Sequence, residues 1–241
     1  MVAPAECGSL FYNYSYKQIH SIVLMAVADA NYRLIYVDTG CNGRISDGGV
    51  FSNCSLHNAL ESKALPLPEP EELPQRLLPV PYVMVADDAF AMTSYILKPY
   101  GYRNQPAPNR IFNYRLSRAH RVIENVFGIM SSKFRVLRKP MNLAPHKVRD
   151  VTLATCALHN FLISTSTDYL CHGSVDYEDR STHETVDGEW RNEPQPEGTL
   201  FPLQRGQHQN YTVSQEDLRD EFREYFMSTA GEVQWQYRFI S

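Results

Sequence analysis

Three acidic residues occur where carboxylates can do chemistry. Asp47 follows a predicted strand in a glycine-rich segment, Asp87 ends a short apolar run, and Glu124 lies on a predicted helix among arginines. Taken singly, Asp47 reads as a turn residue and Glu124 as a surface ion-pair partner. Together they suit a two-metal phosphodiester site, because carboxylates bind hard cations such as Mg²⁺. Two such cations, about 3.5–4 Å apart, stabilise the attacking and leaving oxygens of an in-line displacement.

Positive charge is concentrated around Glu124. Between Arg103 and Arg149 there are eleven Lys or Arg residues and one acid, a local balance of +10, although the whole chain carries −4. Such segregation is typical of proteins that bind a polyanion. A solvated basic helix face, balanced by an acidic tail, would explain the charge equally well.

The elements that position these acids can be placed from the apolar pattern. His20–Asp29 and Arg33–Asp38 predict a β-hairpin whose first strand is buried on both faces. Residues 39–51 are rich in Gly, Asn and Asp and predict a loop. A short helix is expected over residues 50–60.

Further along the chain, residues 64–81 hold six prolines and predict an extended surface loop. Tyr82–Asp87 has the pattern of a buried strand. Apolar residues at helical spacing then predict two amphipathic helices, over residues 116–134 and 142–163.

The C-terminal third differs in composition. Residues 168–197 contain nine acids and two arginines with few large apolar residues, which favours a mobile segment. We expect three parts: an α/β domain over residues 1–165, an acidic flexible segment over 166–212 and a helix over 213–228. On that helix, Leu218, Phe222 and Phe226 share one face, which should dock on the body or on a partner.

Two other sets of residues could carry chemistry. Cys156 and His159 lie one helical turn apart, but no further zinc ligands stand at suitable spacing, so a core histidine is favoured over a metal ligand. Aromatic residues are interleaved with the basic ones and could stack on unpaired bases or pack in a core. These are Tyr95, Tyr100, Tyr102, Phe112 and Tyr114.

Four blocks of the sequence, in this order, resemble the PIF/Harbinger transposase family, a group of DDE-superfamily endonucleases. They are FYNYSYKQIHSIVLMAVADANYRLIYVDTGCNGRISDGGVF, VADDAF, RVIENVFGIMSSKFRVL and CALHNFL. The resemblance covers residues 10–163. Four blocks in the correct order are far more specific than any single acid.

The resemblance implies an α/β fold of the ribonuclease-H-like kind, a mixed sheet with flanking helices, and DNA cleavage with divalent metal, Mg²⁺ or Mn²⁺. It places metal ligands with catalytic roles at Asp47, Asp87 and Glu124, and makes Asp88 a bystander. It implies DNA as substrate, a nuclear location with the cytoplasm as a second compartment, and a Myb-like DNA-binding protein as partner.

The sequence departs from the family pattern at its start. The family's first catalytic aspartate precedes a block that here is Asn13–Lys17, and the residues before that block contain Glu6 but no Asp. We therefore expect an N-terminally truncated domain that lacks the first, central strand. The alternative to a nuclease is a catalytically dead derivative that binds DNA or protein.

A third interpretation takes Asp87 and Glu124 as the acid/base pair of a glycosidase. The flanking arginines oppose it, because they lower rather than raise the pKa of a catalytic acid. Classes that need a membrane span or a disulfide scaffold are not expected. The apolar runs are short, no secretory signal is visible, and the five cysteines form no CxxC pair.

Overall fold

The computed structural model describes residues 11–13, 19–42, 47–101, 104–171, 173–192 and 213–240. The chain divides into two compact units, the first formed by Met1–Asn58 and Arg121–Gln204, the second by Ala59–His120 and Arg205–Ser241. The long helix α3 (Ala107–Lys133) runs through the boundary between them. Each unit has its own hydrophobic core.

The first unit is built on the predicted hairpin. Strands β3 (Ile22–Ala28) and β4 (Leu34–Asn42) pair antiparallel, with Met25 opposite Asp38 and Val27 opposite Tyr36. Asp29 closes the turn, because its carboxylate accepts hydrogen bonds from the backbone N–H groups of Asn31 and Arg33. Before the hairpin, β1 (Tyr12–Asn13) pairs with β2 (Ile19–His20).

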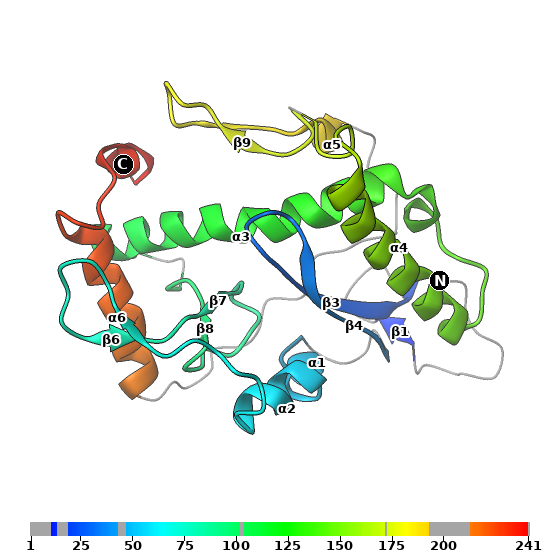
Figure 1. The fold of residues 1–241 in the computed structure, drawn as a ribbon, viewed down its shortest axis with the longest axis horizontal. Coiled ribbons are helices and arrows are strands. Elements are labelled where there is room, and N and C mark those ends of the chain that lie inside the picture. The colour runs from blue at the N-terminus through cyan, green and yellow to red at the C-terminus, as the bar shows by residue number, and fades with distance from the viewer. Residues whose placement is uncertain are drawn as a thin grey trace. The chain divides into compact units, whose positions relative to one another are not determined.

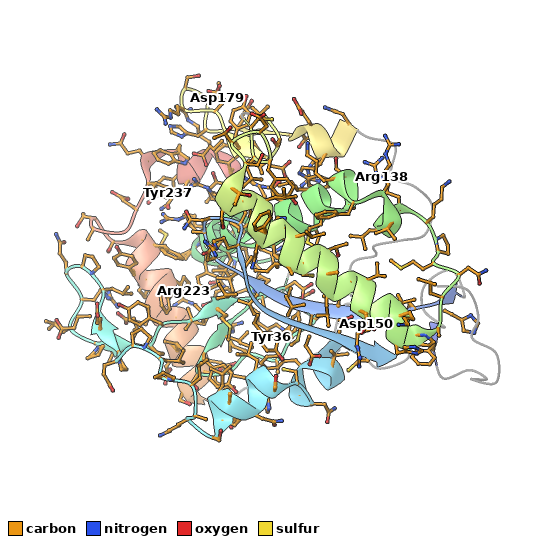
Figure 2. The ribbon with its side chains drawn as sticks, turned by 45° about the vertical axis from the view of Figure 1, so that its right-hand side comes forward. Tyr36, Arg138, Asp150, Asp179, Arg223 and Tyr237 are labelled. Atoms are coloured by element: carbon orange, nitrogen blue, oxygen red, sulfur yellow. The ribbon has the colours of Figure 1, made fainter. Side chains whose placement is uncertain are left out.

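The predicted loop over residues 39–51 was wrong at both ends. Strand β4 continues to Asn42 through an irregularity in its pairing near Gly40. The φ of Gly40 is 124°, a value that glycine adopts readily and other residues rarely do. This bulge explains why the segment resembled a loop in the sequence. Helix α1 (Asp47–Ser52) begins at Asp47, and α2 (Ser55–Glu61) follows, so two short helices replace the single one expected. The Tyr36 hydroxyl lies 2.9 Å from Ser55 Oγ and ties β4 to α2 (Figure 2).

The prediction that the first strand is buried on both faces was also wrong. Of the seven residues of β3, Met25 alone is fully buried, because β3 pairs only with β4 in the part of the chain that is described. Leu24, Ala26 and Ala28 of β3 pack on a core that Leu34 forms with Val126 and Met130 of α3 and Cys156 of α4 (Pro145–Thr165). Helix α4 lies beside the hairpin (Figure 1). The helix predicted over residues 142–163 is therefore confirmed.

The remaining elements of the first unit come after α3 and after α4 in the chain. A single 3₁₀ turn, η1 (Arg135–Arg138), ends α3, since Arg138 donates to the backbone carbonyls of Ser131 and Ser132. After α4, the antiparallel pair β9 (Tyr177–Glu178) and β10 (Thr185–Val186) leads to α5 (Glu189–Asn192). Within residues 173–192, Asp176 and Trp190 hydrogen-bond to Asn125 of α3, and the expected flexibility of residues 166–212 stays a prediction. Residues 193–212 lie outside the described part.

The second unit holds the proline-rich loop and Asp87. Residues 64–79 are largely exposed, as predicted, and carry only the short pair β5 (Glu71–Glu72) and β6 (Pro79–Val80). The strand predicted before Asp87 is β7 (Met84–Val85), parallel to β8 (Ile96–Leu97). A final 3₁₀ segment, η2 (Gln234–Phe239), ends the described chain.

The expected C-terminal helix is α6 (Val213–Met227), which docks within the second unit. Its Leu218, Phe222 and Phe226 pack on the core of that unit, which Leu97, Tyr100, Phe112 and Leu116 form. The N-terminal part of α3 contributes two of these residues, and α3 begins at Ala107, earlier than periodicity predicted. The apolar face of α6 is therefore occupied inside the chain.

The observed fold class is mixed α/β, as expected, with small two-stranded sheets among helices in the described segments. No described helix has the length and apolarity that a membrane crossing requires. The described cysteines, Cys41, Cys54, Cys156 and Cys171, form no disulfide.

Candidate metal centre

Asp87 lies two residues after strand β7, in a turn that a buried lysine holds. Lys98, 6% exposed, donates from Nζ to the carbonyl oxygens of Asp88 at 2.8 Å and Phe90 at 3.1 Å. The backbone N–H of Ala89 donates to Asp87 Oδ1 at 3.0 Å. Asp87 is thus held by local hydrogen bonds just beyond a strand that is shorter and less buried than the sequence predicted.

The Asp87 carboxyl is in a poorly hydrated setting. Burial raises its pKa, and neighbouring Asp88 adds to the rise. The Ala89 hydrogen bond and the positive charges of His120 and Lys98 oppose the rise without cancelling it. A carboxyl with a perturbed pKa beside cations is a common mark of a functional site.

Asp87 is expected to cost the protein stability at neutral pH, because burial disfavours its charged form. The sign follows from the raised pKa: the folded state holds the proton more tightly than the unfolded chain, so stability falls as pH rises through the folded-state pKa. Asp87→Asn should therefore raise the free energy of unfolding by about 0.5–2 kcal/mol, as removal of strained active-site groups commonly does. Urea unfolding at pH 7 and pH 4 measures this gain, and a gain as large at pH 4 would contradict it.

Glu124 lies on α3 in the first unit, with its side chain 48% exposed. Arg191 of α5 approaches it, with Nη2 3.5 Å from Glu124 Oε2. The Glu124 carboxylate is consequently accessible from solvent, and the Arg191 guanidinium contacts it. The next residue, Asn125, is 1% exposed and belongs to the packing of α3.

Asp47 is the first residue of α1, and its side chain lies outside the described part of the structure. Asp87 and Glu124 belong to different units, so their joint binding of cations stays a prediction. Within the described residues, no three His, Cys, Asp or Glu side chains are grouped to hold a metal ion. The donor chemistry nevertheless fits Mg²⁺ or Mn²⁺, because Asp87 and Glu124 both offer carboxylate oxygens.

Sequence reasoning missed the residues that surround Glu124. Asp176, Trp190 and Arg191 lie in the segment that composition marked as mobile, yet they pack on α3 beside Asn125. One signal was available: Trp190 and Arg191 are adjacent in a stretch otherwise poor in aromatic and basic residues. An aromatic–arginine pair in an acidic segment indicates an anchor point.

The Cys156–His159 pair is part of the core, as expected. His159 is 0% exposed, and its ring nitrogens contact the Tyr169 hydroxyl at 2.7 Å and the Tyr32 carbonyl at 2.8 Å. Burial raises the pKa of the Cys156 thiol to about 11, so this cysteine is unreactive at neutral pH. Asn160 pairs with both the N–H and the carbonyl of Leu34, so adjacent side chains of α4 secure the hairpin.

Most of the aromatic residues set among the basic ones belong to the core of the second unit. Tyr95, Tyr100 and Phe112 are at most 8% exposed. Tyr114 stacks on Phe239 with ring centroids 4.9 Å apart. Tyr102 lies outside the described residues. Base stacking by these described rings is therefore not needed to explain them.

Comparison with known proteins places this chain beside nucleases. The family described as "DDE superfamily endonuclease" matches residues 4–160. The protein named "Putative nuclease HARBI1" from Mus musculus is 26% identical over 159 residues, and the human protein of that name is 26% identical over 155. "Protein ALP1-like" from Arabidopsis thaliana is 25% identical over 150 residues.

The matches cover only part of this chain and only part of each relative. They cover 63% of this chain for the mouse and human proteins and 59% for the plant protein. The chain spans 35–40% of the length of these curated relatives. No solved structure matches it. The matched range contains all three candidate carboxylates and excludes residues 173–192.

Proposed function

Because this chain belongs to the DDE superfamily of endonucleases, we propose that it is a divalent-metal-dependent DNA endonuclease of the Harbinger transposase-derived type. One observation carries the proposal: the Asp87 carboxyl is held by backbone at a strand end, where burial raises its pKa. Such a carboxylate gains most from a bound cation, since the cation replaces the lost hydration.

In this proposal, some residues would bind the metal ions and others would position the residues that bind them. Asp47, Asp87 and Glu124 would hold Mg²⁺ or Mn²⁺, which supplies stabilisation of the attacking and leaving oxygens. Lys98 holds the turn that carries Asp87, and His120, when protonated, favours the ionised form of Asp87. A ribonuclease-H-like arrangement of the sheet is the finer fold we propose, and the antiparallel β3–β4 and parallel β7–β8 pairs are compatible with it.

Nicking of supercoiled plasmid tests the proposal. We expect nicking with Mg²⁺ or Mn²⁺ that a chelator stops, and a loss of tenfold or more for Glu124→Gln, because the amide cannot neutralise a cation. The matched control is Glu216→Gln, an exposed glutamate of α6. Chelator-resistant activity would favour a glycosidase-like acid/base pair instead, and nicking that Glu124→Gln leaves unchanged would remove Glu124 from the site.

DNA would contact the basic surface between α3 and α4. We define this basic connection by the exposed residues Lys133, Arg135, Lys139, Lys147 and Arg149. Arg138 and Asp150 mark its two ends in Figure 2. Arg149 pairs with Asp150 at 3.3 Å, and that pair is half exposed, so little of the positive charge is neutralised.

Removing charge from the basic connection should weaken DNA binding in a salt-dependent way. For Lys139→Gln with Lys147→Gln, the slope of log affinity against log salt should fall by about 2, because each phosphate contact releases about 0.9 counterions. The control is Lys63→Gln with Arg180→Gln, two exposed cations elsewhere. Equal slopes for both double variants would exclude this surface. DNA binding without cleavage in the unaltered chain would favour the non-catalytic derivative.

We also propose a nuclear location and a Myb-like partner, which follow from the family resemblance and a DNA substrate. The apolar face of α6 is packed inside the second unit, so it is not offered to that partner in this conformation. Co-purification with a tagged Myb-like protein tests the partner, and imaging of a tagged chain tests the location. An exclusively cytoplasmic signal would contradict the proposed DNA substrate.

A further inference from the structure

A segment outside the family match is attached to α3 beside Glu124. Asn125 Oδ1 accepts hydrogen bonds from the Asp176 backbone N–H and from Trp190 Nε1, both at 2.9 Å, and its Nδ2 donates to the Asp176 carbonyl at 3.3 Å. The Trp190 ring lies over Gly128, where a Cβ would meet it at 2.2 Å. The residue after Glu124 and the glycine one turn later thus anchor residues 173–192 (Figure 1).

The same segment holds Arg191 in one orientation. Asp176, whose side chain is 0% exposed, accepts Arg191 Nε at 2.9 Å on one oxygen and Nη2 at 2.6 Å on the other. The Trp190 ring lies 4.3 Å from Arg191 Cζ, which restricts the guanidinium from another side. Arginine in a two-point pair with a buried carboxylate is rigidly placed.

The restricted guanidinium faces Glu124. Its Nη2, already bound to Asp176, lies 3.5 Å from Glu124 Oε2, and the Glu124 side chain remains 48% exposed. Of the two side chains, Arg191 is held by the buried Asp176, whereas Glu124 is half exposed. We propose that Arg191 is a positioning residue that orients the Glu124 carboxylate for a divalent cation, an inference that rests on the proposed metal site.

This role has a general physical basis. Carboxylates that bind metals are usually held by further hydrogen-bonding partners, and loss of such a partner typically weakens metal affinity 10–100-fold. The buried Asp176 offsets the charge of Arg191, so the pair presents an oriented guanidinium to Glu124 with little net repulsion of a cation. The family match stops at residue 160, so Arg191 would add to the family site from outside it.

Mn²⁺ binding to the full chain, measured by calorimetry, tests the inference without requiring activity. The main variant is Asp176→Asn with Arg191→Gln, which removes both charges and keeps a hydrogen-bonding group at each position. Its dissociation constant for Mn²⁺ should rise about tenfold or more. Arg180→Gln, exposed on the same segment, should leave it unchanged. The NMR signal of the Trp190 indole N–H reports whether the segment is still docked.

Combination with Glu124→Gln separates positioning from a merely structural role. Glu124→Gln alone should weaken Mn²⁺ binding, and the triple variant should lose no more than Glu124→Gln does. If Glu124→Gln binds Mn²⁺ as the unaltered chain does, the metal site and this inference both fall. If Glu124→Gln weakens Mn²⁺ binding but the double variant binds Mn²⁺ as tightly as the unaltered chain, or more tightly, the positioning role alone is overturned.

A second variant keeps the test decisive if the double variant unfolds. Arg191→Lys retains a cation opposite buried Asp176, but a single ammonium cannot reproduce the two-point pair and also reach Glu124. Its Mn²⁺ affinity should fall by a smaller factor than that of the double variant. Affinity equal to that of the unaltered chain would overturn the proposal.

Discussion

Arg191→Met is expected to destabilise the first unit by about 3 kcal/mol, the low end of the 3–5 kcal/mol that breaking a buried ion pair costs. The substitution leaves Asp176, whose side chain is fully buried, without the guanidinium that donates hydrogen bonds to both of its carboxylate oxygens. We take the low end because the Arg191 side chain is 35% exposed and water can reach part of the site. Methionine keeps the length of the side chain, so the lost charge dominates.

The pH dependence provides a second signature of this pair. Burial alone would raise the pKa of Asp176, but hydrogen bonds from Arg191 and Gly188 hold it below its ordinary value. The stability that Asp176 contributes is therefore present above about pH 4 and is lost as pH falls through the lowered pKa. In Arg191→Met, burial without the guanidinium should raise the pKa of Asp176 instead of lowering it. The variant should therefore lose stability as pH rises, and its stability relative to the unaltered chain should be highest in acid.

Urea unfolding followed by Trp190 fluorescence measures both effects. The chain has two tryptophans, and Trp235→Phe leaves Trp190 as the sole reporter of the first unit. Arg180→Met controls for loss of an exposed arginine in the same segment. A loss below about 0.5 kcal/mol, the usual range for surface substitutions, would mean that Asp176 is hydrated rather than buried.

His159→Ala is expected to cost about 2–5 kcal/mol, because it leaves the Tyr169 hydroxyl and the Tyr32 carbonyl without partners and opens a cavity. The Tyr32 carbonyl can only accept, so His159 Nε2 carries the proton and Nδ1 accepts from the Tyr169 hydroxyl. This bond also supports Tyr32, which has a φ of 65° at the hairpin turn. The loss of stability in His159→Ala should therefore be concentrated in the β3–β4 hairpin.

Acid should weaken the same interaction. Burial lowers the pKa of His159, against the hydrogen bond to the Tyr32 carbonyl. The neutral ring is therefore the folded-state form, and stability is retained above about pH 6.5 and lost as pH falls below it, where the unfolded chain takes up a proton. Comparison with His146→Ala, an exposed histidine of α4, isolates the effect. Identical pH profiles for His159→Ala and the unaltered chain would contradict it.

Local sequence patterns predicted the elements whose partners are close along the chain. Alternating and apolar residues gave the β3–β4 hairpin, and helical periodicity gave α4 and the C-terminal half of α3. The packing role of His159 also followed from its place on an apolar helix face. The first nine residues of α3 were missed, because Ile111 and Phe112 are buried in a stretch that is otherwise polar.

The amino-acid sequence by itself determined the family, since the order of short blocks survives where overall identity is low. It also predicted the three carboxylates, whose common role stays a prediction. Only the tertiary structure decided how Glu124 is surrounded. Arg191 meets it across more than sixty residues of chain, from a segment whose composition favoured disorder. Buried Asp176 is the reason, because a carboxylate without hydration requires a fixed cation, and no local periodicity records which distant arginine supplies it.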